Sequence, residues 1–243
     1  MKKIRLGVNI DHVATLRNAR GENFPNLLEI SAILKKSNID LITVHLREDR
    51  RHINDNDLRD LKNRNDLPLN LEMAATQEMK NICLNLRPYA CCIVPEKREE
   101  LTTEGGLDVK QQKVYLAELI SDINNAGIKS SLFIDPVEEQ IRAAKDTGAN
   151  AVEIHTGSFS RAFNKKNHNF EIQRIRRAAE ICQDIDIDCH AGHGLNFKNV
   201  CEVASIPNII ELNVGHFLIS NSIYDGLSST IQKFMKIIKH PSI

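Results

Sequence analysis

The chain has 243 residues, of which 42% are hydrophobic and 26% charged, an ordinary composition for a protein with a sizeable core. This length suits an α/β barrel of roughly 250 residues, so we expect one domain over residues 1–243. Because 32 Lys and Arg residues balance 32 Asp and Glu residues, no overall field attracts nucleic acid or an anionic membrane, and we expect neither as a partner.

Eight short runs of β-type residues alternate with helical patterns, as a parallel sheet with crossover helices requires. Several runs are nearly continuous in apolar residues, which is typical of strands buried on both faces. Eight β-then-α units favour a closed (β/α)₈ TIM barrel with extra short helices over an open sheet. The expected strands cover residues 4–10, 41–46, 69–73, 90–94, 130–134, 151–154, 185–189 and 209–214.

The helical patterns between these runs carry their own start signals. We expect Phe24 and Pro25 to open one helix, and Asp135, followed by Pro136, to cap another that ends near Gly148. Asn196 is the expected cap of a helix after the seventh strand. The last helix is predicted from about Ser222, with Ile223 on its apolar face.

Two features of the chain bear on its compartment. The basic start of the chain is followed by an apolar run that Asn9 and Asp11 interrupt, which does not match a signal peptide. The six cysteines show no paired C-x-x-C spacing, so neither a disulfide framework nor a structural zinc site is indicated. We therefore expect a cytoplasmic protein with no bound metal.

Unusual polar residues follow almost every predicted strand. In a parallel barrel the carboxyl ends of the strands form one rim, so these side chains are expected to meet there. A single such histidine is more often structural than catalytic, but convergence from six strands indicates a polar cavity suited to proton transfer. The residues are Asn9, Asp11, His12, His45, Arg47, Glu72, Glu96, Glu153, His155, His190, His193, Asn213 and His216.

Glycines follow strands seven and eight, where barrels of this kind commonly bind phosphate through backbone N–H groups. Gly192 and Gly194 flank His193, and Gly215 precedes His216, although tight turns would explain these glycines equally well. Arg20, Arg47 and His52 offer groups for an anionic ligand. The long loop over residues 102–108 contains paired glycines and is predicted to be a lid, with a plain surface loop as the alternative.

Seven ordered sequence blocks resemble the pyridoxine 5′-phosphate synthase family from about Leu6 to the final helix. They are GVNIDH at 7–12, TVHLREDRRHI at 43–53, NLEMA at 70–74, VPEKR at 94–98, TTEGGLD at 102–108, EIHTG at 153–157 and AGHGL at 191–195. The resemblance implies a barrel enzyme that joins 3-amino-2-oxopropyl phosphate to 1-deoxy-D-xylulose 5-phosphate without metal or organic cofactor. It also implies a homo-oligomer, usually an octamer.

The resemblance further implies a role for individual residues. His45 and Glu72 correspond to proton acceptors, His193 to a proton donor, and Glu153 to a group that steadies the transition state. Contacts to the aminoketone phosphate are implied for Asn9, Arg20, Gly194, Gly215 and His216, and contacts to the sugar phosphate for Asp11, His12, Arg47, His52 and Thr102. The chain departs from the family at Ser220-Asn221, where a small residue and Arg are expected, and at His190, where Asn is common.

Two other functions compete with this one. A metal-dependent barrel hydrolase would use His190 and His193 with Glu153 and His155 as ligands. A non-catalytic sensor of phosphorylated ligands would keep the glycines and arginines but would not need His45, Glu72 and His193 together.

Overall fold

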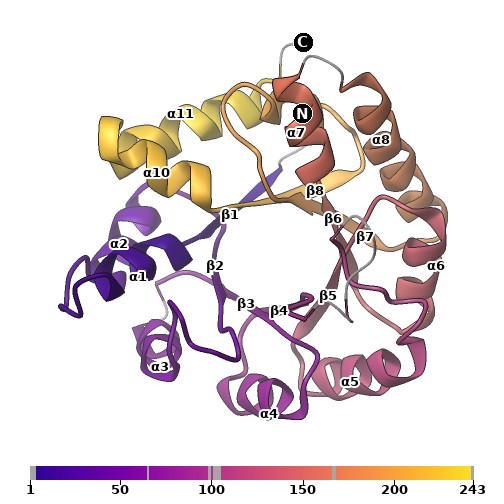
Figure 1. The fold of residues 1–243 in the computed structure, drawn as a ribbon, viewed down its shortest axis with the longest axis horizontal. Helices are drawn as coiled ribbons and strands as arrows, with labels where there is room; N and C mark the ends of the chain where they lie inside the picture. The colour runs from indigo at the N-terminus through magenta and orange to yellow at the C-terminus, as the bar shows by residue number, and fades with distance from the viewer. Residues whose placement is uncertain (1–3, 65, 98–99, 101–104, 166–167, 242–243) are drawn as a thin grey trace.

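Eight parallel strands close into a barrel in the order of the sequence, β1 to β8, which confirms the predicted (β/α)₈ architecture (Figure 1). The computed structural model describes residues 4–64, 66–97, 100, 105–165 and 168–241. The strands are β1 (Arg5–Asn9), β2 (Leu41–His45), β3 (Leu69–Met73), β4 (Ala90–Ile93), β5 (Lys129–Ile134), β6 (Ala151–His155), β7 (Asp188–Gly192) and β8 (Ile209–Val214).

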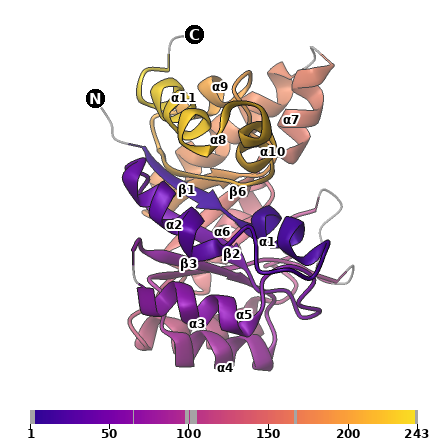
Figure 2. The same cartoon turned by 90° about the vertical axis from the view of Figure 1, so that its left-hand side faces the viewer.

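Helices surround the barrel, and Figure 2 shows the same arrangement from the side. They are α1 (Asp11–Asn18), α2 (Leu27–Lys36), α3 (Asp55–Arg64), α4 (Gln77–Leu86), α5 (Lys113–Asn125), α6 (Glu138–Asp146), α7 (Gly157–Asn164), α8 (Asn169–Asp184), α9 (Val200–Ala204), α10 (His216–Asp225) and α11 (Leu227–Lys239). The helices α1, α7 and α10 are the expected extra ones, each inserted directly after a strand. None of the helices in the described ranges has both the length and the apolarity that a membrane span needs.

The apolar core lies between the strands and the helices. Val8, Val44 and Ile93 on the strands are fully buried in one cluster with Leu34 and Ile141 on the helices. Removing this much apolar surface from water is the main stabilising contribution to the fold.

The barrel interior, by contrast, contains buried polar groups. Thr43 on β2 donates to Asn213 on β8 at 3.0 Å, and Asn213 donates to Glu153 on β6 at 2.8 Å. Because these strands are not neighbours in the sheet, the two bonds cross the interior. The barrel is therefore filled by a hydrogen-bonded polar network below the site.

The seventh strand lies three residues later than predicted, at Asp188–Gly192 instead of 185–189. The apolar residues Ile185 and Ile187 follow helix α8 directly, and Asp186 between them has a left-handed φ of 56°. Apolar residues at a helix end and at a strand start have the same sequence pattern, which explains the error. The shift places His190 inside the strand.

Three predicted helix starts were wrong. The helix α2 begins at Leu27, capped by the Asn26 side chain. The helix α9 begins at Val200, and the Asn196 side chain accepts from the Lys198 N–H in the turn before it. The helix α6 begins after Val137 with no side-chain cap, because the Asp135 carboxylate is bonded elsewhere.

The predicted last helix is divided in two at Gly226, whose φ of 75° and ψ of 151° end α10 and start α11. The break turns the Ile223 side chain outward, where it is 76% exposed. Ile223 is therefore not part of the core, contrary to the predicted apolar face.

Candidate active site

A cavity of about 700 Å³ lies at the carboxyl ends of the strands, a volume in the range of small-molecule sites. Five of the six histidines predicted at this rim line it, and His190 is the exception. Most other predicted site residues line it too. The predicted residues on the cavity wall are Asn9, Asp11, His12, His45, Arg47, Glu72, Glu153, His155, His193, Gly194, Asn213, Gly215 and His216.

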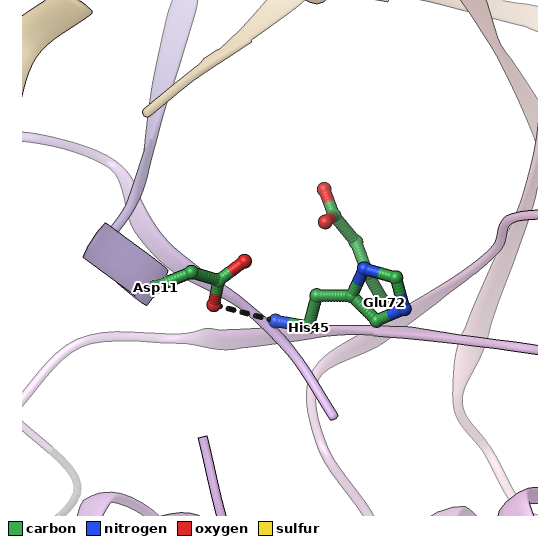
Figure 3. Close-up of side chains that lie close together, drawn as sticks. All are labelled: Asp11, His45 and Glu72. Carbon is green, nitrogen blue, oxygen red and sulfur yellow. Dashed lines mark hydrogen bonds between the residues drawn. The ribbon is translucent and has the colours of Figure 1, made fainter. Parts of the chain in front are cut away.

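Asp11, His45 and Glu72 form the closest cluster in the cavity (Figure 3). One side-chain ligand atom from each lies within 4.8 Å of the others, because His45 and Glu72 are register partners on β2 and β3. The backbone N–H of His45 donates to Asp11 Oδ1 at 2.9 Å. The Asn9 amide donates to Asp11 Oδ2 at 2.8 Å and to Glu72 Oε2 at 3.3 Å, so it connects the two carboxylates.

Burial raises the pKa of both carboxyl groups. Desolvation, together with the charges of Glu153 and Asp11, raises the pKa of Glu72 well above its ordinary value. Desolvation also raises the pKa of Asp11 to about 6, against the lowering effect of its hydrogen bonds from His45 and Asn9. A group that titrates near the working pH is suited to general acid–base catalysis.

Glu153 lies opposite this cluster and is almost completely buried. Desolvation and the charge of Glu211 raise its pKa to about 8, and the hydrogen bond from Asn213 opposes the shift. Gly192 on the neighbouring strand makes room for it, since a methyl group there would overlap Glu153 Oε1. Glu153 is therefore a mainly neutral carboxylic acid at pH 7 that can become a strong buried base.

His193 has a left-handed backbone with a φ of 81°, a conformation that costs of order 1–3 kcal/mol in a residue other than glycine. Its ring centroid lies 4.9 Å from that of His155, whose Nδ1 bonds Asp135 Oδ1 at 3.1 Å. Desolvation and the charges of His155 and Arg161 lower the pKa of His193 to about 4. Backbone strain of this kind concentrates at functional sites.

The opposite part of the rim offers groups for anions. Gly215 occupies the N-cap position of α10, so the first N–H groups of that helix are directed toward the cavity end of β8. The rings of His12 and His216 meet there with centroids 4.9 Å apart. Arg47 lines the cavity. Its Nε lies 3.6 Å from an Asp49 carboxylate oxygen and its Nη2 lies 3.6 Å from a Glu96 carboxylate oxygen, and both distances are too long for strong pairing.

Some predicted site residues lie elsewhere. Arg20 is exposed in the turn after α1 and does not line the cavity. His52 does not line the cavity either, and its ring centroid lies 6.1 Å from that of His45, which does. Thr102 and the first part of the predicted lid lie outside the described residues, whereas Gly106 donates its N–H to Asp135 Oδ2 at 3.0 Å.

The prediction for His190 was wrong. Its Nδ1 lies 3.3 Å from Glu211 Oε1, and its Nε2 lies 3.5 Å from the guanidinium of Arg5, the first residue of β1. It therefore occupies the amino-terminal end of the barrel interior and does not reach the rim. The ligand set of the metal hydrolase is not assembled, because the His190 ring contacts Glu211 and Arg5 and does not line the cavity that His155 and His193 share.

The sequence interpretation placed Glu96 at the rim but gave it no role, and it left Asp135 out of the site. Glu96 Oε1 lies 2.7 Å from His45 Nε2, and Asp135 contacts His155 as described above. The only signal for either was its place just after a strand. Asp135 was assigned to a helix cap because Asp before Pro is also typical of a helix start.

Comparison with known proteins identifies the family. Residues 6–240 match the profile of the family described as "Pyridoxal phosphate biosynthesis protein PdxJ". The chain belongs to the PdxJ family. Curated relatives named pyridoxine 5′-phosphate synthase include one from Rhodospirillum rubrum, 52% identical over 95% of this chain and 92% of the relative. Another, from Ehrlichia ruminantium, is 48% identical over 99% of this chain and 100% of the relative.

Solved structures show the barrel in more distant proteins. Tryptophan synthase from M. tuberculosis aligns with a TM-score of 0.65 and 9% identity, over 98% of this chain and 94% of that one. A 3-keto-L-gulonate-6-phosphate decarboxylase from Vibrio cholerae aligns with a TM-score of 0.64 and 9% identity, over 98% of both chains. At this identity the likeness concerns the fold alone. The PdxJ family match therefore carries the functional argument.

Proposed function

We propose that this PdxJ-family protein condenses 3-amino-2-oxopropyl phosphate with 1-deoxy-D-xylulose 5-phosphate to form pyridoxine 5′-phosphate, inorganic phosphate and water. The observation that carries the proposal is the convergence of Asp11, His45, Glu72, Glu153 and His193 on one cavity. Imine formation, elimination and ring closure each move protons, and no single group can be acid and base at once. A binding module would not need this many titratable groups in one site.

In the proposed mechanism His45 and Glu72 accept protons and Glu153 stabilises a cationic species. The raised pKa of Glu72 supports this role, because a carboxylate with a raised pKa is a stronger base once it is ionised. In this proposal the ammonium group of the aminoketone binds beside Glu72. A nearby positive charge favours the ionised carboxylate, so substrate binding itself activates the base.

His193 is the proposed proton donor, and its lowered pKa of about 4 makes it neutral in the free enzyme. The two substrates bring negatively charged phosphate groups into the cavity that His193 lines. Nearby negative charge favours the imidazolium form. In this proposal His193 becomes a competent acid only after the substrates have bound.

The proposed contacts to the two substrates divide between two sides of the cavity. Backbone groups of Gly194 and Gly215 with Asn9 and His216 contact the aminoketone substrate, while Asp11, His12 and Arg47 contact the sugar substrate. Asn221, where the family has Arg, donates instead to Asp225 and to Thr230 at 3.1 Å and so connects α10 to α11. Phosphate contact at this end is therefore assigned to backbone N–H groups.

Arg20 and His52 remain proposed contacts, although each would have to change position to reach the cavity. Thr102 also remains a proposed contact and lies outside the described residues. We also propose one domain over residues 1–243, a cytoplasmic location and a homo-oligomer. The exposed Ile223 and Tyr224 on α10, 76% and 86% accessible, support contact with a second copy. Light scattering of the wild type and of Tyr224→Glu tests this assembly, because a monomeric wild type would contradict it.

The decisive experiment incubates the purified protein with both phosphorylated substrates and follows phosphate release and pyridoxine 5′-phosphate formation. His45→Gln, Glu72→Gln and His193→Asn should each lose about 10²–10⁴-fold in turnover and keep the native circular dichroism spectrum. Binding without turnover would support a sensor instead, and loss of activity after chelation would support a metal-dependent enzyme.

A further inference from the structure

We propose that Glu96 is a positioning residue for His45: it fixes the imidazole as the tautomer with the proton on Nε2 and leaves Nδ1 free to accept a proton. The inference rests on the proposed function, in which His45 is a base. It adds a residue from the segment after β4 to a site otherwise built on strand ends.

The contact between the two side chains is short and buried. Glu96 Oε1 lies 2.7 Å from His45 Nε2, with 5% and 12% of the two side chains exposed. The His45 ring is thus held at Nε2 by Glu96, which does not line the cavity. Figure 3 shows the other ring nitrogen directed toward the Glu72 carboxylate.

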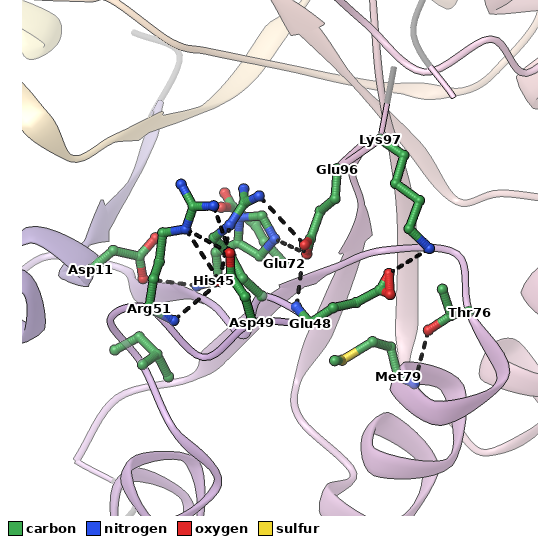
Figure 4. A network of polar contacts seen from close by, with 12 residues as sticks. Asp11, His45, Glu48, Asp49, Arg51, Glu72, Thr76, Met79, Glu96 and Lys97 are labelled. Carbon is green, nitrogen blue, oxygen red and sulfur yellow. Dashed lines mark hydrogen bonds and ion pairs between the residues drawn. The ribbon is translucent and has the colours of Figure 1, made fainter. Parts of the chain in front are cut away.

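Other groups hold the Glu96 carboxylate in place (Figure 4). Its Oε2 accepts a hydrogen bond from the backbone N–H of Glu48 at 3.2 Å and lies 3.6 Å from Arg47 Nη2. The backbone N–H of Glu96 donates to Glu100 Oε2 at 2.7 Å, which orders the turn that carries it. The carboxylate therefore has a defined position before any ligand binds.

The charge state of Glu96 decides the tautomer. Burial alone would raise the pKa of Glu96, but the hydrogen bonds from His45 and from the Glu48 N–H and the charge of Arg47 oppose burial, and the pKa is lowered. An ionised carboxylate has acceptor sites only, so the hydrogen atom between the two groups belongs to His45 Nε2. The neutral ring then has its lone pair on Nδ1, the atom that faces Glu72.

A carboxylate that orients a catalytic imidazole is a general solution to this problem, because a base in the wrong tautomer cannot accept a proton from its substrate. Removing the orienting carboxylate should lower turnover by no more than removing the base itself does. For Glu96→Ala we expect turnover to fall about 10- to 100-fold with a much smaller change in KM.

The test reads the tautomer directly in the ligand-free enzyme. Nitrogen-15 chemical shifts of the His45 ring, assigned with His45→Gln, should show the Nε2–H form in the wild type. In Glu96→Ala this preference should be lost, whereas Glu96→Gln keeps an acceptor and should retain the tautomer and more activity than the alanine variant. Glu48→Gln is the matched control, since its side chain pairs with Lys97 and does not contact His45.

Each outcome decides between the alternatives. A proton on Nδ1 in the wild type, or a Glu96→Ala enzyme with wild-type tautomer and turnover, overturns the inference. If Glu96→Ala does not fold, Glu96→Met, which has a similar size but no carboxylate acceptor, tests the same point: wild-type tautomer and turnover in this variant would overturn the inference. Because the shifts are measured without substrate, full activity of His45→Gln would refute the role of His45 while the tautomer result would stand.

Discussion

Replacing Glu153 by Gln is expected to stabilise the fold and to remove part of the pH dependence of its stability. Desolvation, with the charge of Glu211, raises the Glu153 pKa from 4.5 to about 8. Between these pH values the folded protein holds a proton that the unfolded chain has released. Unfolding therefore releases a proton, and the stability that the neutral acid contributes is complete below about pH 4.5 and is lost as the pH rises through about 8.

The size of the effect follows from the distance between 4.5 and the pH of the measurement, at about 1.36 kcal/mol per pH unit. At about pH 7 the free energy of unfolding of the wild type is therefore about 3 kcal/mol lower than at low pH, as far as Glu153 is concerned. Gln cannot ionise but can still accept the hydrogen bond from Asn213. The free energy of unfolding of Glu153→Gln should thus be larger than that of the wild type by at most about 3 kcal/mol at pH 7. This difference should vanish near pH 4.5.

Urea unfolding at fixed protein concentration, followed at several pH values between about 5 and 8, measures this difference by linear extrapolation. Glu180→Gln is the control, because its carboxylate is 50% exposed beside Arg177 and should give no trend with pH. The reasoning is refuted if Glu153→Gln is no more stable than the wild type at pH 7, or if the difference does not grow with pH. Turnover should fall in the same variant if Glu153 stabilises a cationic species.

Three further substitutions test other parts of the site. His193→Gly should abolish most turnover but leave the thermal midpoint unchanged or raised, since glycine tolerates a φ of 81°; a lower midpoint would argue against backbone strain. Asp135→Ala removes a buried acceptor for His155 and Gly106 and should lower the free energy of unfolding in urea by about 1–3 kcal/mol. Asp146→Ala on the surface is the control and should lower it little, so equal decreases would contradict the assignment. Arg47→Lys should raise the KM for the sugar phosphate about 10-fold with a smaller change in kcat, because Lys lacks the planar fork; an unchanged KM would remove Arg47 from the binding site.

The strands were the most predictable part of the fold. The predicted strands 69–73 and 209–214 agree with β3 and β8 at both ends. A short apolar run between turn residues directly reports burial on both faces, which is a local property of the chain. Helix starts were less predictable, because Asp135 and Asn196 have the residue types of caps but their side chains bond other partners.

The sequence alone determined most of the residues that reach the rim, because the end of each strand is largely encoded locally and the closed parallel topology brings all the ends together. It did not determine which partner each side chain meets. Glu96 contacts His45 across 51 positions of the chain, and Asp135 contacts His155 across 20. Such contacts depend on strand stagger and loop paths, which only the closed barrel sets. For the same reason a three-residue shift of β7 was enough to move His190 to the opposite end of the barrel, although its residue type suits the rim equally well.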